Sequence, residues 1–174
     1  TALAATAPTI GTMSTYAIIS STFTNSNTSP QTIINGDRCD TTPPTTAPIT
    51  TTGTITTGGC DAALGTTQTS ALADLNSQAC TSIGAAVDLN AITVSGYPTG
   101  TFPPGCYSST GAMNIVTGTT VTLSGAGVYI FRPAGVLTTE ANSLVVLANG
   151  ASASDVFWTP VGATTLGANA ALSL

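Results

Sequence analysis

The pair of carboxylates best placed for catalysis is Asp37 and Asp40, which lie close together after the dipeptide Asn35-Gly36. Two carboxylates at a suitable separation can hydrolyse a glycosidic bond, one as the acid and the other as base or nucleophile. Asn-Gly-Asp is also a common turn sequence, in which such side chains shape the backbone. We therefore expect Asp37 to have a structural role rather than a catalytic one.

Other catalytic chemistries lack their essential residues, because the sequence contains neither histidine nor lysine. Triads built on a histidine base, lysine nucleophiles and phosphate-binding P-loops are thereby excluded. Glu140 and Asp155 could contribute to a calcium site, but two carboxylates make a poor one. The sequence predicts a non-enzymatic protein without catalytic residues, metal site or cofactor.

Four cysteines, Cys39, Cys60, Cys80 and Cys106, indicate an oxidising compartment. They allow three pairings, and the sequential one, Cys39 with Cys60 and Cys80 with Cys106, would close two loops of moderate length. Zinc is disfavoured because C-x-x-C pairs and histidine are absent, and free buried thiols are the alternative for an intracellular protein. We predict a secreted protein, extracellular or at the cell surface, with a glycosylation sequon at Asn27.

Charged residues make up only 5% of the chain, whereas hydrophobic residues make up 42%. The formal net charge is −5, and Arg38 and Arg132 are the only cations. Two cations cannot neutralise a nucleic-acid backbone or hold an anionic membrane surface. No apolar run reaches the roughly 20 residues that a transmembrane helix needs. We therefore expect neither nucleic acid nor membrane as a partner.

One helix is expected among many strands. Asp61 can cap its start, and apolar residues then recur at helical spacing, which predicts a helix over residues 61–80. Residues 41–59 are rich in Thr, Pro and Gly, which is typical of an extended loop or a cap. Strands are predicted before this loop at residues 14–20 and 31–35.

From residue 90 onward the sequence consists of short strand-like segments separated by glycines. Evenly spaced short strands fit a sandwich, a barrel or a solenoid. No hairpin turn sequences separate the segments, and Thr and small residues dominate their ends, which favours stacked coils. No exact repeat is visible. The predicted strands are residues 91–95, 105–109, 112–116, 120–124, 127–133, 143–150 and 155–160.

Alternation within these segments predicts which side chains face outward. In TVTLS (120–124) the apolar residues point one way and the hydroxyls the other, so stacked coils would align the hydroxyls into a flat face. GVYIFRP (127–133) and SLVVL (143–147) are apolar at both sets of positions, which predicts burial on both sides. The aromatic residues of the strands are expected to pack in the core rather than form a carbohydrate platform. The expected outward hydroxyls are Thr93, Ser95, Thr120, Thr122 and Thr138.

Several segments resemble the ice-binding domain family in order and in sequence. IGTMSTYAIIS (10–20) is similar to the family's LGTAxxFAILA, IINGDRCDTTP (33–43) to its ITGDLGVSP turn, and FPPGCYSS (102–109) to LxPGVYC with a displaced cysteine. LSGAGVYIFRPAGVLTTEANSLVVLANGASASDVFWTPVGATTLG (123–167) is similar to LxGxGVFIFQxxxxLTTxxGSxVxLxNGAxAxxVFWQVGxxATLG. The resemblance covers nearly the whole chain. It implies one mainly β domain over residues 1–174, a discontinuous right-handed β-solenoid with one long α-helix packed alongside.

The sequence departs from the family at two places. Arg38 and Cys39 replace the usual Leu-Gly, and the sequence ends at ANAALSL (168–174), where family members continue with a segment that completes the solenoid. A solenoid left unfinished would expose unpaired edges and pair with another copy of itself, whereas a fragment of a longer protein would give the same ending.

Two functions follow from these observations. The first hypothesis is a structural subunit that self-assembles head-to-tail into an extracellular filament or surface layer, with residues 1–10 as an extended arm that could be donated to a neighbour as a strand. The alternative, implied by the resemblance, is a secreted ice-binding protein, antifreeze or inhibitor of ice recrystallisation, that uses the flat face of hydroxyls. The expected assembly contacts are Thr1, Ala2, Leu3, Ala4, Ala5, Leu172 and Leu174.

Overall fold

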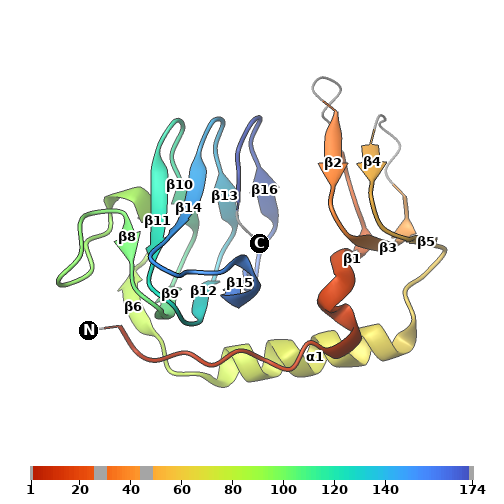
Figure 1. The fold of residues 1–174 in the computed structure, drawn as a ribbon, viewed down its shortest axis with the longest axis horizontal. Helices are drawn as coiled ribbons and strands as arrows, with labels where there is room; N and C mark the ends of the chain where they lie inside the picture. The colour runs from red at the N-terminus through yellow and green to blue at the C-terminus, as the bar shows by residue number, and fades with distance from the viewer. Residues whose placement is uncertain (1, 26–30, 44–48, 173–174) are drawn as a thin grey trace. The chain divides into compact units, whose positions relative to one another are not determined.

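The computed structural model describes residues 2–25, 31–43 and 49–172. The contacts between residues group the chain into two compact units. The resemblance to the family implies a single domain. The solenoid unit comprises residues 1–8 and 74–174, and the N-terminal unit comprises residues 9–73. Helix α1 (Ala62–Ser77) contributes residues to both units (Figure 1). Among the described residues, no helix is long and apolar enough to cross a membrane.

The solenoid unit consists of short parallel strands that stack in successive coils (Figure 1). Two short 3₁₀ helices, η2 (Leu89–Ala91) and η3 (Ala153–Asp155), lie between strands. The strands are β6 (Thr81–Gly84), β7 (Val87–Asp88), β8 (Thr101–Phe102), β9 (Gly105–Ser109), β10 (Met113–Ile115), β11 (Thr120–Ser124), β12 (Tyr129–Pro133), β13 (Leu137–Thr139), β14 (Leu144–Ala148), β15 (Val156–Trp158) and β16 (Thr164–Leu166).

These strands form three sheets, which the chain visits in turn. The sheet β6-β9-β12-β15 is called the helix face, β7-β10-β13-β16 the carboxylate face, and β8-β11-β14 the threonine face. Gly105, Tyr129 and Val156 are register partners on three successive coils, and the two intervals between them differ in length. This difference explains why the sequence shows no exact repeat.

The core of the solenoid unit contains a stack of aromatic rings from successive coils. The rings of Tyr107 and Phe131 stack with centroids 5.4 Å apart, and those of Phe131 and Trp158 with centroids 4.4 Å apart. Phe102 lies edge-on to both Tyr107 and Phe131. These residues therefore pack in the core, as the strand pattern predicts, and do not form a platform for sugars.

Strand β12 of the helix face is buried on both sides, which confirms the prediction for GVYIFRP. Tyr129 and Phe131 point into the core, whereas Ile130 packs outward in a cluster with Leu75 of α1 and Cys106. Arg132 Nη1 donates hydrogen bonds to the carbonyl oxygens of Leu75 (3.3 Å) and Gln78 (2.8 Å). A cation at this position satisfies carbonyls that the end of a helix leaves without partners.

The N-terminal arm is held by the solenoid unit of its own chain, in contrast to its predicted role as a strand donated to a neighbour. Leu3 bridges Cys106 in antiparallel fashion, and its amide donates to Thr81 Oγ1 at 3.2 Å. Gln78 bonds both the amide and the carbonyl of Thr6, each at 2.8 Å.

The other residues expected to make assembly contacts lie in different environments. The side chains of Ala2, Ala5 and Leu172 pack against the hydrophobic clusters of their own chain, and Ala4 is exposed. Thr1 and Leu174, like the sequon residue Asn27, lie outside the described residues.

The predicted strand at residues 91–95 is wrong. Ala91 ends η2, and residues 92–95 belong to a loop closed by a hydrogen bond from the Gly100 amide to the Ile92 carbonyl at 2.7 Å. Ile92 and Val94 still pack against the core, so their alternation reflects a loop that covers apolar surface and not a strand. The sequence also gave no prediction for the short strands β6, β7, β8, β13 and β16.

The N-terminal unit contains two small parallel sheets, β1-β3-β5 and β2-β4, together with most of α1. Asp61 Oδ1 accepts a hydrogen bond from the Ala63 amide at 2.9 Å, which confirms the predicted helix cap, and the helix ends at Ser77, before Cys80. The other elements of the N-terminal unit are η1 (Gly11–Thr15), β1 (Tyr16–Thr22), β2 (Thr32–Ile34), β3 (Asp37–Thr42), β4 (Ile49–Thr51) and β5 (Ile55–Thr57).

Candidate binding surface

The threonine face contains a long regular pairing of parallel strands. Strands β11 and β14 pair over five positions, from Thr120 with Leu144 to Ser124 with Ala148. Val121 and Leu123 point inward and are fully buried, so Thr120 and Thr122 must point outward. Both threonines were predicted as outward hydroxyls from alternation alone, and the structure brings them together.

Outward side chains of successive coils line up in rows across this face. One row contains Thr101, Thr122 and Val146, and the next contains Thr120, Leu144 and Ala171. Neighbouring strands are roughly 4.8 Å apart and outward residues along a strand roughly 6.7 Å apart, so the side chains form a regular two-dimensional grid.

The prediction that SLVVL is buried on both sides is wrong. Val145 is buried, whereas Leu144 and Val146 are 40% and 42% exposed. Nothing covers the outer side of β14 within the described part of the chain, so these apolar groups join the threonines on the same surface. The apolar run therefore concealed two members of the grid that sequence reasoning assigned to the core.

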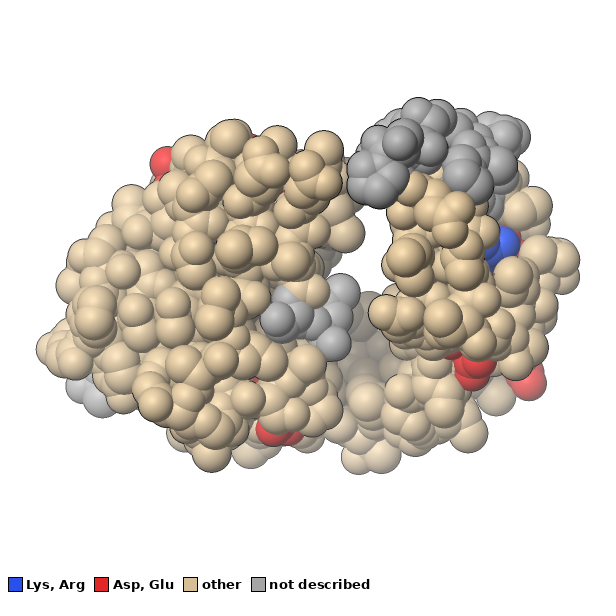
Figure 2. Space-filling view, turned by 45° about the horizontal axis from the view of Figure 1, so that its top comes forward, with Lys and Arg blue, Asp and Glu red and all other residues tan. Residues whose placement is uncertain are grey.

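The side chains of the grid are uncharged. Within the described residues, neither Thr120 Oγ1 nor Thr122 Oγ1 has a hydrogen-bond partner in the protein, so both can bind water. The view in Figure 2 shows how few charged side chains the surface carries. The chemistry available on this face is an alternation of hydroxyl and methyl groups at fixed spacing.

Stacked turns fix one edge of the threonine face. In each turn the amide of the fourth residue donates to the carbonyl of the first, and the third residue has positive φ, as in type II turns. These third residues are Gly118 (φ 68°), Asn142 (φ 58°) and Asn169 (φ 57°). The residue after each turn is an outward residue of the grid: Thr120, Leu144 or Ala171. The turns are Val116–Thr119, Glu140–Ser143 and Gly167–Ala170.

The carboxylate face has shorter strands and a different chemistry. Its central outward row contains Asp88, Asn114, Thr138 and Thr165. Asn114 Nδ2 donates to Asp88 Oδ1 at 3.4 Å, so part of this row is engaged within the protein. Thr138, predicted for the same surface as Thr120, therefore lies on a separate face.

Glu140 closes one end of the carboxylate face. Its Oε2 accepts hydrogen bonds from the Thr117 hydroxyl at 2.7 Å and from the Thr117 amide at 2.9 Å. These bonds, the hydroxyl first and the amide second, favour the ionised carboxylate and hold the pKa of Glu140 below its usual value.

Thr93 and Ser95 belong to neither face. They lie in the loop after η2, where they line a shallow pocket with Ile83 and Tyr107. The hydroxyls of Thr93 and Thr99 form a hydrogen bond with each other at 2.8 Å. Their prediction as outward strand hydroxyls was wrong because residues 91–95 do not form a strand.

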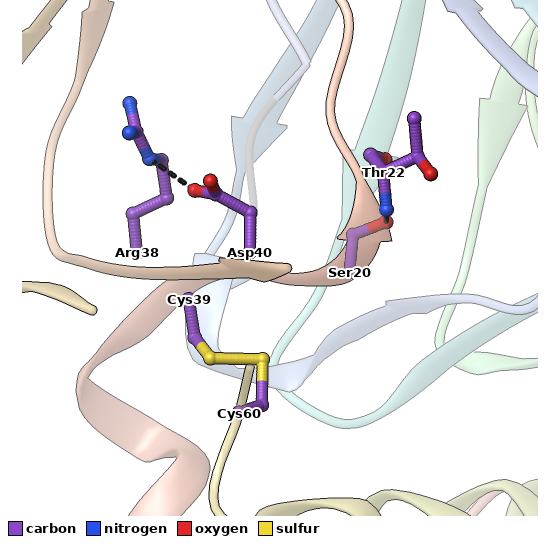
Figure 3. A network of polar contacts seen from close by, with 6 residues as sticks. All are labelled: Ser20, Thr22, Arg38, Cys39, Asp40 and Cys60. Carbon is purple, nitrogen blue, oxygen red and sulfur yellow. Dashed lines mark hydrogen bonds and ion pairs between the residues drawn. A yellow bond between two sulfur atoms is a disulfide. The ribbon is translucent and has the colours of Figure 1, made fainter. Parts of the chain in front are cut away.

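The two carboxylates with the best spacing for catalysis have separate structural tasks. Asp37 Oδ1 accepts a hydrogen bond from the Thr54 amide at 2.7 Å. Bonds from the Thr15 hydroxyl, then from the Thr54 amide, lower the pKa of Asp37. Asp40 is fully buried and pairs with Arg38, with Nε and Oδ1 2.6 Å apart (Figure 3). Asp40 therefore contributes to the packing of the N-terminal unit.

The same strand explains the departure from the family at Arg38 and Cys39. Successive residues of β3 point to opposite sides, so Arg38 reaches Asp40 on one side and Cys39 reaches Cys60 on the other (Figure 3). The second disulfide joins Cys80 and Cys106. Sequential pairing of the cysteines is thus confirmed, and the described residues include no free cysteine and no metal-binding cluster.

Comparison with known proteins identifies the family. The Ice-binding-like family profile matches residues 5–173, so this chain belongs to that family. A relative named ice-binding protein, from Flavobacterium frigoris (strain PS1), is 40% identical over 81 residues, which are 47% of this chain. The matched region spans only 28% of that relative's length.

Solved structures of ice-binding proteins share the fold at low sequence identity. The protein from the Antarctic ascomycete Antarctomyces psychrotrophicus superposes with a TM-score of 0.64 at 19% identity, over 97% of this chain and 98% of its own. The DUF3494 domain of ice-binding protein 1 from Shewanella frigidimarina gives 0.70 at 17% identity, over 96% and 97%. The protein from an Arctic yeast gives 0.70 at 19% identity, over 94% and 77%. The fold is therefore that of the β-solenoid ice-binding proteins.

Proposed function

We propose that this chain binds ice, and that the threonine face is its contact surface. Membership of the Ice-binding-like family supports the function. The observation that carries the choice of surface is the uncharged grid in register around Thr120, Thr122, Leu144 and Val146. The same reading assigns the protein no enzymatic activity and no cofactor, with ice as its partner.

The physical basis is the match between a rigid periodic surface and a crystal of water. Hydroxyls such as Thr122 Oγ1 can hold waters in fixed positions, and ordered waters at an interface are nearly as favourable as direct hydrogen bonds. The free energy falls when exposed methyl groups are removed from liquid water. Charged groups would resist this contact because removing their hydration is costly. A flat face with hydroxyls, methyls and no charges meets these conditions.

An extracellular location fits the same proposal. Both disulfides pair cysteines within the chain, and disulfides persist in oxidising compartments. Ice that threatens a cell also forms first in the water around it, so a secreted protein would meet it there.

The filament hypothesis has less support than its alternative. The relatives found are named as ice-binding proteins, and the arm proposed as a donated strand is bonded to its own chain. We therefore do not carry self-assembly forward as the function.

The test is a matched pair of bulky substitutions, Thr122→Tyr on the threonine face and Thr138→Tyr on the carboxylate face. Both residues are half-buried outward threonines of central strands. A tyrosine should lift the surface away from a flat crystal plane only where that plane is bound. We expect Thr122→Tyr to abolish most thermal hysteresis and ice shaping and Thr138→Tyr to preserve them, measured by nanolitre osmometry with circular dichroism as the folding control.

Two results would contradict the proposal. Loss of activity in Thr138→Tyr alone would move the contact surface to the carboxylate face. Absence of hysteresis, ice shaping and recrystallisation inhibition in the unsubstituted protein would remove the function itself.

A further inference from the structure

Glu140 makes a contact between coils that neither the fold nor the family match explains. It follows β13, opens the turn Glu140–Ser143 and extends its carboxylate back to the preceding coil. There a single oxygen, Oε2, accepts both the hydroxyl and the amide of Thr117. Thr117 is the second residue of the neighbouring turn, Val116–Thr119.

The turn that receives this contact has the most flexible residue of the three stacked turns. Gly118 occupies the positive-φ position that asparagine fills in the other two coils. Glycine has the largest conformational freedom to lose, so a turn built on it needs additional restraint. Asn142, by contrast, is joined to the next coil by the amide of Asn169, which donates to its Oδ1 at 3.3 Å.

The position of Thr120 depends directly on this turn. Thr119 is the last residue of the turn, and Thr120 is the first outward residue that follows on β11. Its register with Leu144 places it in the row that ends at Ala171.

Backbone bonds to the next coil hold the third and fourth residues of the turn, since the Gly118 amide donates to the Ala141 carbonyl at 3.0 Å and the Thr119 carbonyl accepts from the Leu144 amide at 2.9 Å. The Glu140 carboxylate adds a restraint at the second residue, Thr117, which none of these bonds holds.

We propose that Glu140 is a positioning residue for the threonine face: it holds the turn Val116–Thr119 so that Thr120 stays in register with its row. This inference rests on the proposed function, because it assigns the position of Thr120 a role in ice contact. Glu140 itself lies at the edge of the carboxylate face and acts through Thr117.

The test compares Glu140→Ala, Glu140→Gln and Asp88→Ala. Glu140→Ala removes both bonds to Thr117, whereas Glu140→Gln can keep them because one amide oxygen can accept both donors. Asp88→Ala removes an equal charge from the same face at a site that contacts Asn114 and not the turn. Amide hydrogen exchange at Thr117 and thermal hysteresis are measured for each variant.

We expect Glu140→Ala to speed exchange of the Thr117 amide by about fivefold or more, as the loss of a hydrogen bond predicts, and to reduce hysteresis. Glu140→Gln should recover most of both signals, and Asp88→Ala should change neither. Hysteresis in Glu140→Ala equal to that of the unsubstituted protein would overturn the inference, and so would an equal loss in Asp88→Ala.

These failures differ from failure of the proposed function. If the unsubstituted protein showed no activity on ice, ice binding would be rejected, and thermal hysteresis could not be compared between the variants. The exchange arm would still show whether Glu140 holds the turn. If Thr122→Tyr abolished activity while Glu140→Ala did not, ice binding by the threonine face would stand and the positioning role of Glu140 would fall.

Discussion

The threonine face and the carboxylate face are built on the same coils yet present different surfaces. Both are parallel, both are in register, and both cover one core. The threonine face has five paired positions between β11 and β14, whereas the carboxylate face has three between β10 and β13. Longer strands present more than one outward row, so regular stacking becomes a two-dimensional surface only where the strands are long enough.

The use of polar groups separates the two faces further. On the carboxylate face Asp88 bonds Asn114, and Glu140 bonds Thr117, so these side chains hold the protein together. On the threonine face Ser124 Oγ accepts a hydrogen bond from Asn149 Nδ2 at 2.8 Å, whereas the hydroxyls of Thr120 and Thr122 have no partner within the described residues and remain open to water. Stacked coils thus place the outward side chains of any face at a fixed spacing. The chemistry of those side chains decides whether their polar groups bond to each other or to water.

The largest effect should come from the shared core. Leu123 lies beneath the threonine face and Leu137 beneath the carboxylate face, and they are 0% and 1% exposed. Substituting either by alanine should lower the free energy of unfolding by about 2–5 kcal/mol, because each leaves a cavity in the same cluster. Denaturant unfolding followed by circular dichroism measures this change.

The two leucines should differ in their effect on activity. At temperatures near freezing, where both variants remain folded, Leu123→Ala should reduce hysteresis more than Leu137→Ala because it lies under the proposed contact surface. Leu166→Ala is the control, since Leu166 is 55% exposed and its truncation removes little buried contact. A loss in either core variant as small as that of Leu166→Ala would contradict its place in the shared core.

A smaller effect should come from the turns at the edge of the threonine face. Gly118 has φ 68°, and a Cβ added there would meet nothing within 4 Å. Gly118→Val should therefore destabilise through backbone strain and not through a clash, by about 1–2 kcal/mol. Its expected effect on activity is a loss of hysteresis, since the turn leads directly into Thr120.

Gly118→Asn provides the matched comparison for that turn. Asparagine tolerates the left-handed region, and the equivalent positions Asn142 and Asn169 already contain it. We expect this variant to keep both stability and hysteresis within the error of the unsubstituted protein. Equal losses in the two variants would show that the open space at Gly118, and not its backbone conformation, is what the turn requires.

Much of this arrangement was accessible from the sequence, because alternation and motif order depend on local pattern. Thr120 and Thr122 were placed on one face by the period of TVTLS, and the solenoid fold by the resemblance to the family. Leu144 and Val146 were assigned to the core because apolar residues at both sets of positions usually mean burial on both sides. Only the sheet that contains β14 shows that its outer side is uncovered.

Contacts between coils could not be predicted from the sequence. The bond from Thr117 to Glu140 joins residues on different coils, and unequal coil lengths hide the register that brings them together. Thr93 and Ser95 failed for a related reason, since a loop that covers the core can show the same alternation as a strand. Long-range register, and not local pattern, determines both cases.

The smallest expected effect concerns acid, and it also separates the faces. The pKa of Glu140 is lowered by its bonds from Thr117, so its contribution to stability is present above the pKa of the unfolded chain and is lost as pH falls through the folded value. Asp37 in the N-terminal unit behaves in the same direction, so global unfolding at low pH would mix the two groups. The protection factor of the Thr117 amide, which is its exchange rate corrected for the intrinsic effect of pH, isolates Glu140 and should fall as the pH drops below about 4.3, the ordinary pKa of a glutamate. In Glu140→Gln this fall in protection should be absent, and the threonine face should keep its hysteresis as far into acid as the protein stays folded.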